Sequence, residues 1–308
     1  MTWRKLARYA PSGSHIYHYT DAAALISILE KGELRFTDIE CLNDELDSTY
    51  LGELYKKAAR DLKAGLREDP DGRAAKFLDL VEGKARYLPV RPFVCCFSRQ
   101  YDALNQWRNY TGAGSYCIAF DRDQLVSTVE ELCGKRSGYA FWAGDVDYGG
   151  AESVPVQLAS SLRSFLEATK PPMPLQHTIS YEAEHRSDRV QESLQEADAI
   201  RFKHISFKHE AEYRIAMLSP PGAVAKDKVG EAGVYLDYFA HRSFIRPSVV
   251  VRFGARFKSM IKAVCVGPGT YKTVAREKVT MMLRHFDYRI DDEHVVPVEE
   301  SESTFRHI

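Results

Sequence analysis

Short runs typical of β-strands and longer runs typical of helices follow one another irregularly along this chain, and this irregularity most restricts its fold. Apolar and β-branched residues cluster at His15–Thr20 and Phe93–Ser98, whereas apolar residues recur every three or four positions over Leu46–Arg86. Strand-like runs follow one another without the regular strand–helix–strand order of a parallel sheet. The pattern therefore predicts the α+β class.

The strongest candidate for a domain boundary is Lys170–Pro174, which contains three prolines. Helical patterns precede and follow it, at Glu152–Ala168 and Glu182–Ala199, and strands resume near Glu212–Leu218. We therefore interpret the proline-rich segment as a loop within one domain, residues 1–308. That domain would carry helical insertions at about 46–86 and 152–199.

Charge and composition exclude some classes of protein. Lys and Arg number 42 against 43 Asp and Glu, so the net charge of −1 argues against nucleic-acid binding through bulk charge. We find neither a membrane-spanning apolar run nor a signal peptide and expect a cytoplasmic protein without a membrane partner. The six cysteines include no C-x-x-C pair, so we expect no disulfide framework and no metal.

The first candidate site is the run Ile16–Thr20. In a strand, His18 shares one face with Ile16 and Thr20, while Tyr17 and Tyr19 occupy the other face. A histidine at the end of a strand is well placed to form a hydrogen bond with a ligand in a cleft. The alternative is a core histidine that bonds to a backbone carbonyl.

The second candidate site follows the buried strand that ends at Ser98. A short helix next presents Trp107 and Tyr110, which are three residues apart and therefore lie on one side of it. Large aromatic side chains at this position can stack on a flat ring of a ligand. In the alternative interpretation they close one end of the hydrophobic core.

The third candidate site is an E-x-E pair, Glu210 and Glu212, followed by Arg214. In a strand these three side chains face one way, and the two carboxylates lie ~7 Å apart. One carboxylate can orient a substrate hydroxyl while the other stabilises a developing cation or takes a proton. The alternative is a solvated strand face on which Arg214 pairs with a glutamate.

Three separated blocks of sequence resemble a bacterial domain-of-unknown-function family, DUF2971. The blocks are Y-H-Y-T-x-x-x-A-L-x-x-I-L-x-x-G-x-L-R-F from Tyr17, F-S-x-x-x-D-x-L-x-Q-W-R-x-Y from Phe97, and F-K-H-E-x-E-Y-R from Phe207. The resemblance extends to Ile261–Pro268 and Ser303–Arg306, and it covers most of the chain.

The layout of these blocks also resembles a distant form of the ADP-ribosyltransferase fold, which implies a mixed, mostly antiparallel sheet and NAD as substrate. By this resemblance Glu212 is the catalytic glutamate, Glu210 is its partner, and His18 holds the NAD ribose. The aromatic rings of Trp107 or Tyr110 would flank the nicotinamide. The implied cofactor-binding residues are His18, Tyr19, Thr20, Ser98, Trp107, Tyr110 and Arg214.

The expected function is that of an NAD-using ADP-ribosyltransferase-like enzyme, of the kind found in toxins or phage-defence effectors. Its acceptor would be a protein, a nucleic acid or water, and a phage protein or an antitoxin would be a further partner. One alternative is a metal-independent, nuclease-like toxin in which His18, Glu212 and Arg214 act on RNA. Another alternative is a non-enzymatic sensor or immunity module that binds a nucleotide.

Overall fold

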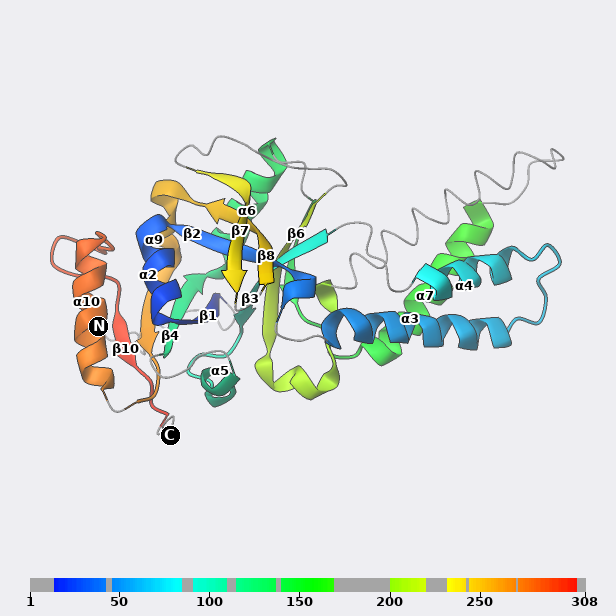
Figure 1. Ribbon diagram of the computed structural model, residues 1–308, viewed down its shortest axis with the longest axis horizontal. Helices are drawn as coiled ribbons and strands as arrows, with labels where there is room; N and C mark the ends of the chain where they lie inside the picture. Colours follow the sequence, from blue (N-terminus) through cyan, green and yellow to red (C-terminus); the bar gives the residue numbers. More distant parts are fainter. Residues whose placement is uncertain are drawn as a thin grey trace.

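A single ten-stranded sheet dominates the computed structural model, which describes residues 14–42, 46–84, 91–109, 115–136, 140–168, 200–219, 232–241, 244–269 and 271–303 (Figure 1). The strands are β1 (His15–Asp21), β2 (Glu33–Asp38), β3 (Arg91–Ser98), β4 (Ser115–Asp121), β5 (Ala140–Asp145), β6 (Glu212–Ser219), β7 (Gly233–His241), β8 (Phe244–Arg252), β9 (Ile261–Val266) and β10 (Val298–Glu300). The helices are α2 (Ala22–Lys31), α3 (Leu46–Ala64), α4 (Arg73–Lys84), α5 (Leu104–Asn109), α6 (Arg122–Arg136), α7 (Gly150–Ala168), α9 (Phe257–Met260) and α10 (Lys272–His285), with 3-10 turns η1 (Ile39–Cys41), η2 (Ile205–Glu210) and η3 (Gly254–Arg256).

The strands follow the order β10-β9-β4-β1-β3-β2-β8-β7, and β6 lies between β3 and β5. Every described pair is antiparallel except β9 with β10, which is parallel. Helices and strands are mixed without regular alternation. The α+β class and the mostly antiparallel sheet predicted from the sequence are therefore confirmed.

The sheet opens on one side of β3. One edge of this strand pairs with β6 over its whole length, from Arg91 to Ser98. The other edge pairs with β1 only at Ser98 and with β2 only at Phe93 and Val94. Strands β1 and β2 therefore diverge, and residues 95–97 of β3 have no strand partner on this edge among the described residues. We call this opening the sheet gap.

Helix α2 connects the two diverging strands, and its ends are set by the local sequence. The side chain of Asp21 accepts a hydrogen bond of 2.8 Å from the backbone N–H of Ala24, which caps the first turn. Gly32 ends the helix in the left-handed conformation, with φ of 62°, where glycine carries no Cβ penalty. Leu25 and Leu29 are buried on one face, as the spacing predicts.

The main hydrophobic core lies on one face of the sheet, beneath α2, α6, α9 and α10. Alternation along the strands directs Ile16, Phe36, Phe97, Phe120 and Ile215 to this face, and each is almost completely buried. Phe97 and Phe120 pack edge to face with ring centroids 5.9 Å apart. These contacts fix β1, β2, β3, β4 and β6, which surround the sheet gap.

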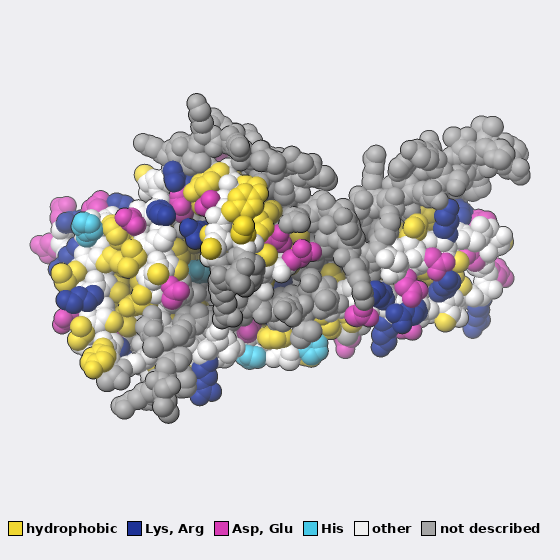
Figure 2. Space-filling model, viewed as in Figure 1, with side chains coloured by type: hydrophobic (Ala, Val, Ile, Leu, Met, Phe, Trp, Pro, Cys, Tyr) yellow, Lys and Arg dark blue, Asp and Glu magenta, His cyan; other side chains and the backbone are white. Residues whose placement is uncertain are grey.

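Helices α3, α4 and α7 pack against one another and extend away from the opposite face of the sheet (Figure 1). Their shared core includes a stacked pair, Phe77 and Phe165, and reaches Val94 and Ala216 on the sheet. Figure 2 shows Lys and Arg side chains mixed with Asp and Glu over these helices. One of the ion pairs joins Arg60 of α3 to Glu82 of α4 at 2.9 Å.

Some sequence expectations differ from the structure or fall outside it. The apolar, β-branched run Val295–Val298 predicts a last strand there, but the strand lies at Val298–Glu300, because Val295 and Val296 bond with Arg289 and Tyr288 instead. The helix predicted over 182–199 lies outside the described residues. All six cysteines are described, and none forms a disulfide. Within the described ranges, no helix is both long and apolar enough to cross a membrane.

Candidate functional site

A cleft of about 220 Å³ lies at the sheet gap. Side chains from β1, β2, β3, β6 and β8, from α5 and η2, and from the segments after η1 and before η2 line it, so segments from most of the chain meet here. The lining residues are Tyr17, His18, Tyr19, Arg35, Thr37, Leu42, Val94, Cys95, Cys96, Phe97, Ser98, Gln106, Lys203, Glu210, Glu212, Arg214 and Arg246.

His18 bonds to the backbone of the neighbouring strand across the gap. Its Nδ1 atom lies 3.0 Å from the carbonyl oxygen of Cys96. A carbonyl can only accept, so Nδ1 carries the hydrogen and Nε2 keeps its lone pair. Burial lowers the pKa of His18, and the hydrogen bond to Cys96 offsets only part of this effect. The imidazole is therefore neutral at pH 7 and offers one acceptor atom to a ligand.

Glu212, at the start of β6, is held in its ionised form. Arg214 donates to both of its carboxylate oxygens, over 2.7 Å from Nε and 3.2 Å from Nη2, and Lys203 Nζ lies 3.3 Å from Oε2. Burial alone would raise the pKa of Glu212, but the positive charges of Arg214 and Lys203 outweigh it and lower the pKa to about 2. Glu212 is thus a permanent anion beside two cations.

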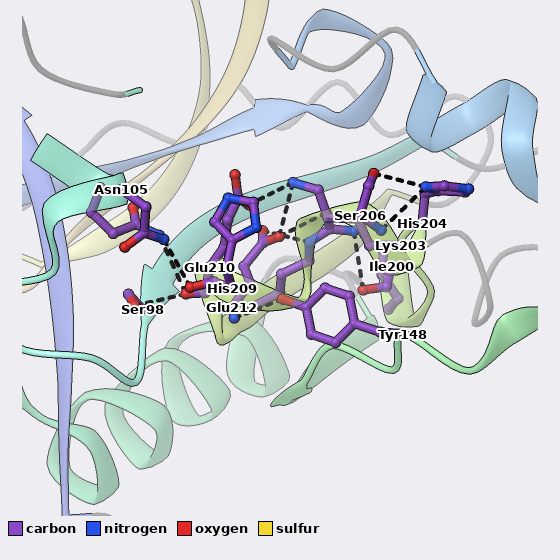
Figure 3. A network of polar contacts seen from close by, with 12 residues as sticks. Ser98, Asn105, Tyr148, Ile200, Lys203, His204, Ser206, His209, Glu210 and Glu212 are labelled. Atoms are coloured by element: carbon purple, nitrogen blue, oxygen red, sulfur yellow. Dashed lines mark hydrogen bonds and ion pairs between the residues drawn. The ribbon is translucent and has the colours of Figure 1, made fainter. Parts of the chain in front are cut away.

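Glu210 does not share a strand face with Glu212, contrary to the spacing prediction. It ends the turn η2, and Ala211 then adopts the left-handed conformation with φ of 44° before β6 begins. This turn brings both carboxylates to one cation, because Oε2 of Glu210 lies 2.9 Å from Nζ of Lys203 (Figure 3). The alternative of a solvated strand face is wrong in its exposure, since Glu210, Glu212 and Arg214 are all buried, but the pairing of Arg214 with a glutamate that it included is present.

Hydrogen bonds from the last residue of β3 and from the segment after it hold this turn in place (Figure 3). Ser98 Oγ donates to the carbonyl oxygen of Glu210 at 2.8 Å, and Gln106 Nε2 donates to the same oxygen at 3.2 Å. Asn105 Nδ2 donates to the carbonyl of His209 at 2.8 Å. Ser98 Oγ also accepts from the N–H of Gln100 at 3.0 Å. The Ser98 hydroxyl therefore positions the turn that carries Glu210.

The predicted aromatic wall is placed differently. Trp107 is fully buried, packs edge-on against Tyr19 with centroids 4.7 Å apart and donates from Nε1 to Asp102, so it belongs to the core and does not line the cleft. Tyr19 lines the cleft. Thr20 is buried beside the cleft without lining it. Tyr110 lies outside the described residues.

Sequence reasoning missed several lining residues, of which Lys203 and Arg35 are the most informative. Two glutamates that are buried together require a compensating cation, but only the structure shows that they are buried. Arg35 stands between two buried residues, Leu34 and Phe36, so strand alternation places it on the opposite face of β2. The alternation around Arg35 can be read from the sequence block that begins at Tyr17, which ends with Leu34, Arg35 and Phe36.

Residues 106–215 match a family model described as "Protein of unknown function (DUF2971)". This match supports the predicted family over those residues. No curated protein and no solved structure matches this chain.

Only part of the cleft is lined by residues within the segment that matches DUF2971. The matched segment supplies the buried ion cluster of Lys203, Glu210, Glu212 and Arg214, whereas His18 comes from a strand that precedes it. Alternation places Glu212 and Arg214 on the face of the sheet opposite to the main core, and His18 approaches from the core face, with its ring 5.5 Å from that of Phe97. Because the sheet is open at the sheet gap, side chains from both faces of the sheet line one cleft.

The chemistry available in this cleft is acid–base and electrostatic. His18 can accept a hydrogen bond or a proton at Nε2. Glu212 can stabilise positive charge, although its carboxylate already interacts with Lys203 and Arg214. Within the described residues, no group of three or more His, Cys, Asp or Glu side chains is arranged to hold a metal ion.

Proposed function

We propose that this cleft binds NAD, breaks the bond between nicotinamide and ribose, and transfers ADP-ribose to a protein, a nucleic acid or water. One observation carries the proposal. His18 and Glu212 are almost two hundred residues apart, yet they line the same cleft, one as a neutral hydrogen-bond acceptor and the other as a permanent anion.

The reaction places specific demands on these groups. When the bond from C1′ to the nicotinamide nitrogen breaks, its electrons leave with nicotinamide and positive charge develops on the ribose, as in glycoside cleavage. An oxygen of the acceptor then bonds to C1′ and loses its proton. In the proposal His18 Nε2 accepts a hydrogen bond from a ribose hydroxyl, Glu212 stabilises the developing cation, and Glu210 acts on the acceptor side.

A second candidate function is nucleotide binding without cleavage, as in a sensor or immunity module. It is favoured by the ion pairs of Glu212, because Arg214 and Lys203 engage both carboxylate oxygens. A carboxylate held in this way stabilises the strand end and leaves fewer lone pairs for a ribose hydroxyl. Both candidates require a nucleotide in the cleft, and they differ in whether nicotinamide is released.

The test uses the purified full chain with NAD, alone and with cell extract. Nicotinamide release is measured by chromatography, and NAD binding is measured by calorimetry. Release above background supports the enzyme. Binding without release under every condition supports the nucleotide-binding module. Cleavage of RNA in the presence of a chelator, without NAD binding, would instead identify the nuclease-like alternative.

The proposed role as a toxin or phage-defence effector has its own test. Expression of the wild-type chain should slow cell growth and deplete cellular NAD or modify a macromolecule, and the inactive variant His18→Asn should do neither. Equal growth with both proteins, at equal expression and under phage challenge, would reject this role.

A further inference from the structure

An apolar groove of about 590 Å³ lies between α2 and α10 and shares no lining residue with the cleft at the sheet gap. Leu25 and Val279 line it and belong to the main core, whereas Ile26 and Met281 line it with 46% and 59% of their surface exposed. Figure 2 shows hydrophobic side chains gathered over the region where Figure 1 places α2 and α10. Exposed apolar surface that is gathered in one place is typical of a site that binds a partner.

The edge of α10 beside the groove has the residue spacing of a helix that packs along a second helix. The residues on this edge are, in chain order, Val274, Lys278, Met281 and His285, and all four are exposed. They follow one another at intervals of four, three and four residues, which keeps side chains in line between two packed helices. We call these four residues the α10 seam. It alternates apolar and basic side chains.

The basic side chains of the α10 seam have no acidic neighbours on it. Among the described residues, no Asp or Glu lines the groove, and Lys278 forms no ion pair. The ring of His285 packs against Phe286 with centroids 5.2 Å apart, and its nitrogens have no hydrogen-bond partner within the described part of the chain. An occupant must therefore bring apolar side chains for the groove and acceptor oxygens for Lys278 and His285.

These requirements distinguish between the possible occupants. A second copy of this chain would bring the same seam, which adds a lysine and a histidine but no carboxylate. An anionic membrane binds clusters of basic residues on an open surface. Two other basic residues of α10 are engaged elsewhere, since Lys272 donates to the carbonyl of Ser301 and Arg276 to that of Val298. The groove and its single lysine fit an acidic helix better than either.

We propose that the groove and the α10 seam bind an amphipathic helix of a partner protein, whose carboxylates pair with Lys278 and His285. Such helices anchor themselves through apolar residues about one heptad apart. Val274 and Met281 are seven residues apart, or ~10.5 Å along α10, which matches this spacing. Met281 and Met282 are unbranched and adapt to the shape of the side chains that they contact. The proposal does not depend on NAD, because no residue of the cleft takes part.

The test uses two designed helical peptides labelled with fluorescein. Both have leucines on one face, and the positions beside the leucines are glutamates in one peptide and lysines in the other. Fluorescence anisotropy with the full chain at low salt should show that the glutamate peptide binds at least about 10-fold more tightly than the lysine peptide. Lys278→Glu should reverse this preference. Ile26→Ser should weaken binding of the glutamate peptide at least about 5-fold, because it removes apolar contact area.

The matched control is Arg284→Glu, because Arg284 is exposed on α10 but does not line the groove. This variant should keep the preference for the glutamate peptide. Absence of peptide binding, equal binding of both peptides, or the same change in Lys278→Glu and Arg284→Glu would overturn the proposal. It is also overturned if sedimentation detects a dimer that Ile26→Ser dissociates, or if the chain binds phosphatidylserine vesicles and Ile26→Ser abolishes this binding. Circular dichroism confirms that each variant is folded.

Discussion

The Nδ1 atom of His18 donates a hydrogen bond to the carbonyl oxygen of Cys96 across the gap between β1 and β3. This carbonyl belongs to the part of β3 that has no strand partner on that edge among the described residues. The histidine thus satisfies a backbone group that the divergence of β1 and β2 leaves open. The same bond fixes the tautomer in which Nε2 keeps its lone pair, and His18 lines the cleft.

Two substitutions of His18 should separate these two tasks. His18→Asn retains a donor near the position of Nδ1 but has no atom at the position of Nε2, whereas His18→Gln reaches the Nε2 position. We expect His18→Asn to lower nicotinamide release about 100-fold or more, while the melting temperature stays close to that of wild type. His18→Gln should retain more activity. Full activity in His18→Asn would show that Nε2 takes no part.

Activity should fall in acid because His18 must be neutral to accept a hydrogen bond. Burial lowers its pKa below the ordinary value of 6.5, so half of the molecules become protonated only at a pH below 6.5. A plot of nicotinamide release against pH should therefore be flat near neutrality and decline on the acid side with a midpoint below 6.5. In His18→Gln this acid limb should disappear. A midpoint above 6.5 would contradict the buried, neutral histidine.

Stability should also decrease in acid, because the pKa values of Glu212 and His18 are both lower in the folded chain than their ordinary values. The pKa of Glu212 is about 2 in the folded chain against an ordinary 4.5, so its contribution is complete above 4.5 and is lost as the pH falls toward 2. His18 contributes above 6.5 and loses this contribution as the pH falls. Urea unfolding at pH 7, 5 and 3 should therefore show progressively lower free energies of unfolding.

Lys203 is the cation that both buried glutamates share, and its removal should be costly. Lys203→Met keeps the length of the side chain but leaves Glu210 and Glu212 with less compensation in a buried site. We expect a loss of about 3–5 kcal/mol in the free energy of unfolding. The control is Lys258→Met, because Lys258 forms an exposed pair with Asp287 at 3.1 Å. That change should cost less than about 1 kcal/mol.

Chemical denaturation at pH 7 measures both lysine variants. Equal stability of Lys203→Met and Lys258→Met would show that the buried ion cluster contributes no more than a surface pair.

Local signals in the sequence were sufficient to predict the helix and strands around the cleft. Asp21 and Gly32 mark the ends of α2, and period-two alternation identifies β1 and β3, because capping and alternation depend on neighbouring residues only. The relation between Glu210 and Glu212 was not predictable in this way. It depends on a left-handed alanine, Ala211, which spacing does not reveal.

The composition of the cleft depends on contacts between distant segments. Lys203 matters because the fold buries two glutamates beside it, and Arg246 matters because β8 pairs with β2. The sequence pattern around Trp107 was compatible with stacking on a ligand and with closing the core. Only its packing against Tyr19 places it in the core. The divergence of β1 and β2, which creates the cleft, has no signature in either strand alone.

Glu212→Gln tests the electrostatic part of the proposed function. The structure shows that this substitution should affect stability as well as activity. The spacing of an E-x-E pair suggests an exposed carboxylate whose replacement leaves the fold unaffected, but Glu212 is buried between Arg214 and Lys203. The substitution removes the charge that balances both cations. It should therefore reduce stability by about 3 kcal/mol as well as activity.

The two effects can be separated because activity is measured per folded molecule, at a temperature below the unfolding transition of the variant. Under those conditions nicotinamide release by Glu212→Gln should still fall about 100-fold or more, since the variant cannot stabilise the positive charge on the ribose. Glu210→Gln should release nicotinamide closer to the wild-type rate and mainly impair transfer to an acceptor. The control is Glu131→Gln, which affects an exposed pair with Arg256 at 2.9 Å and should leave both properties nearly unchanged. Wild-type release by folded Glu212→Gln would make this glutamate structural, and nucleotide binding without cleavage would then become the better account of the cleft.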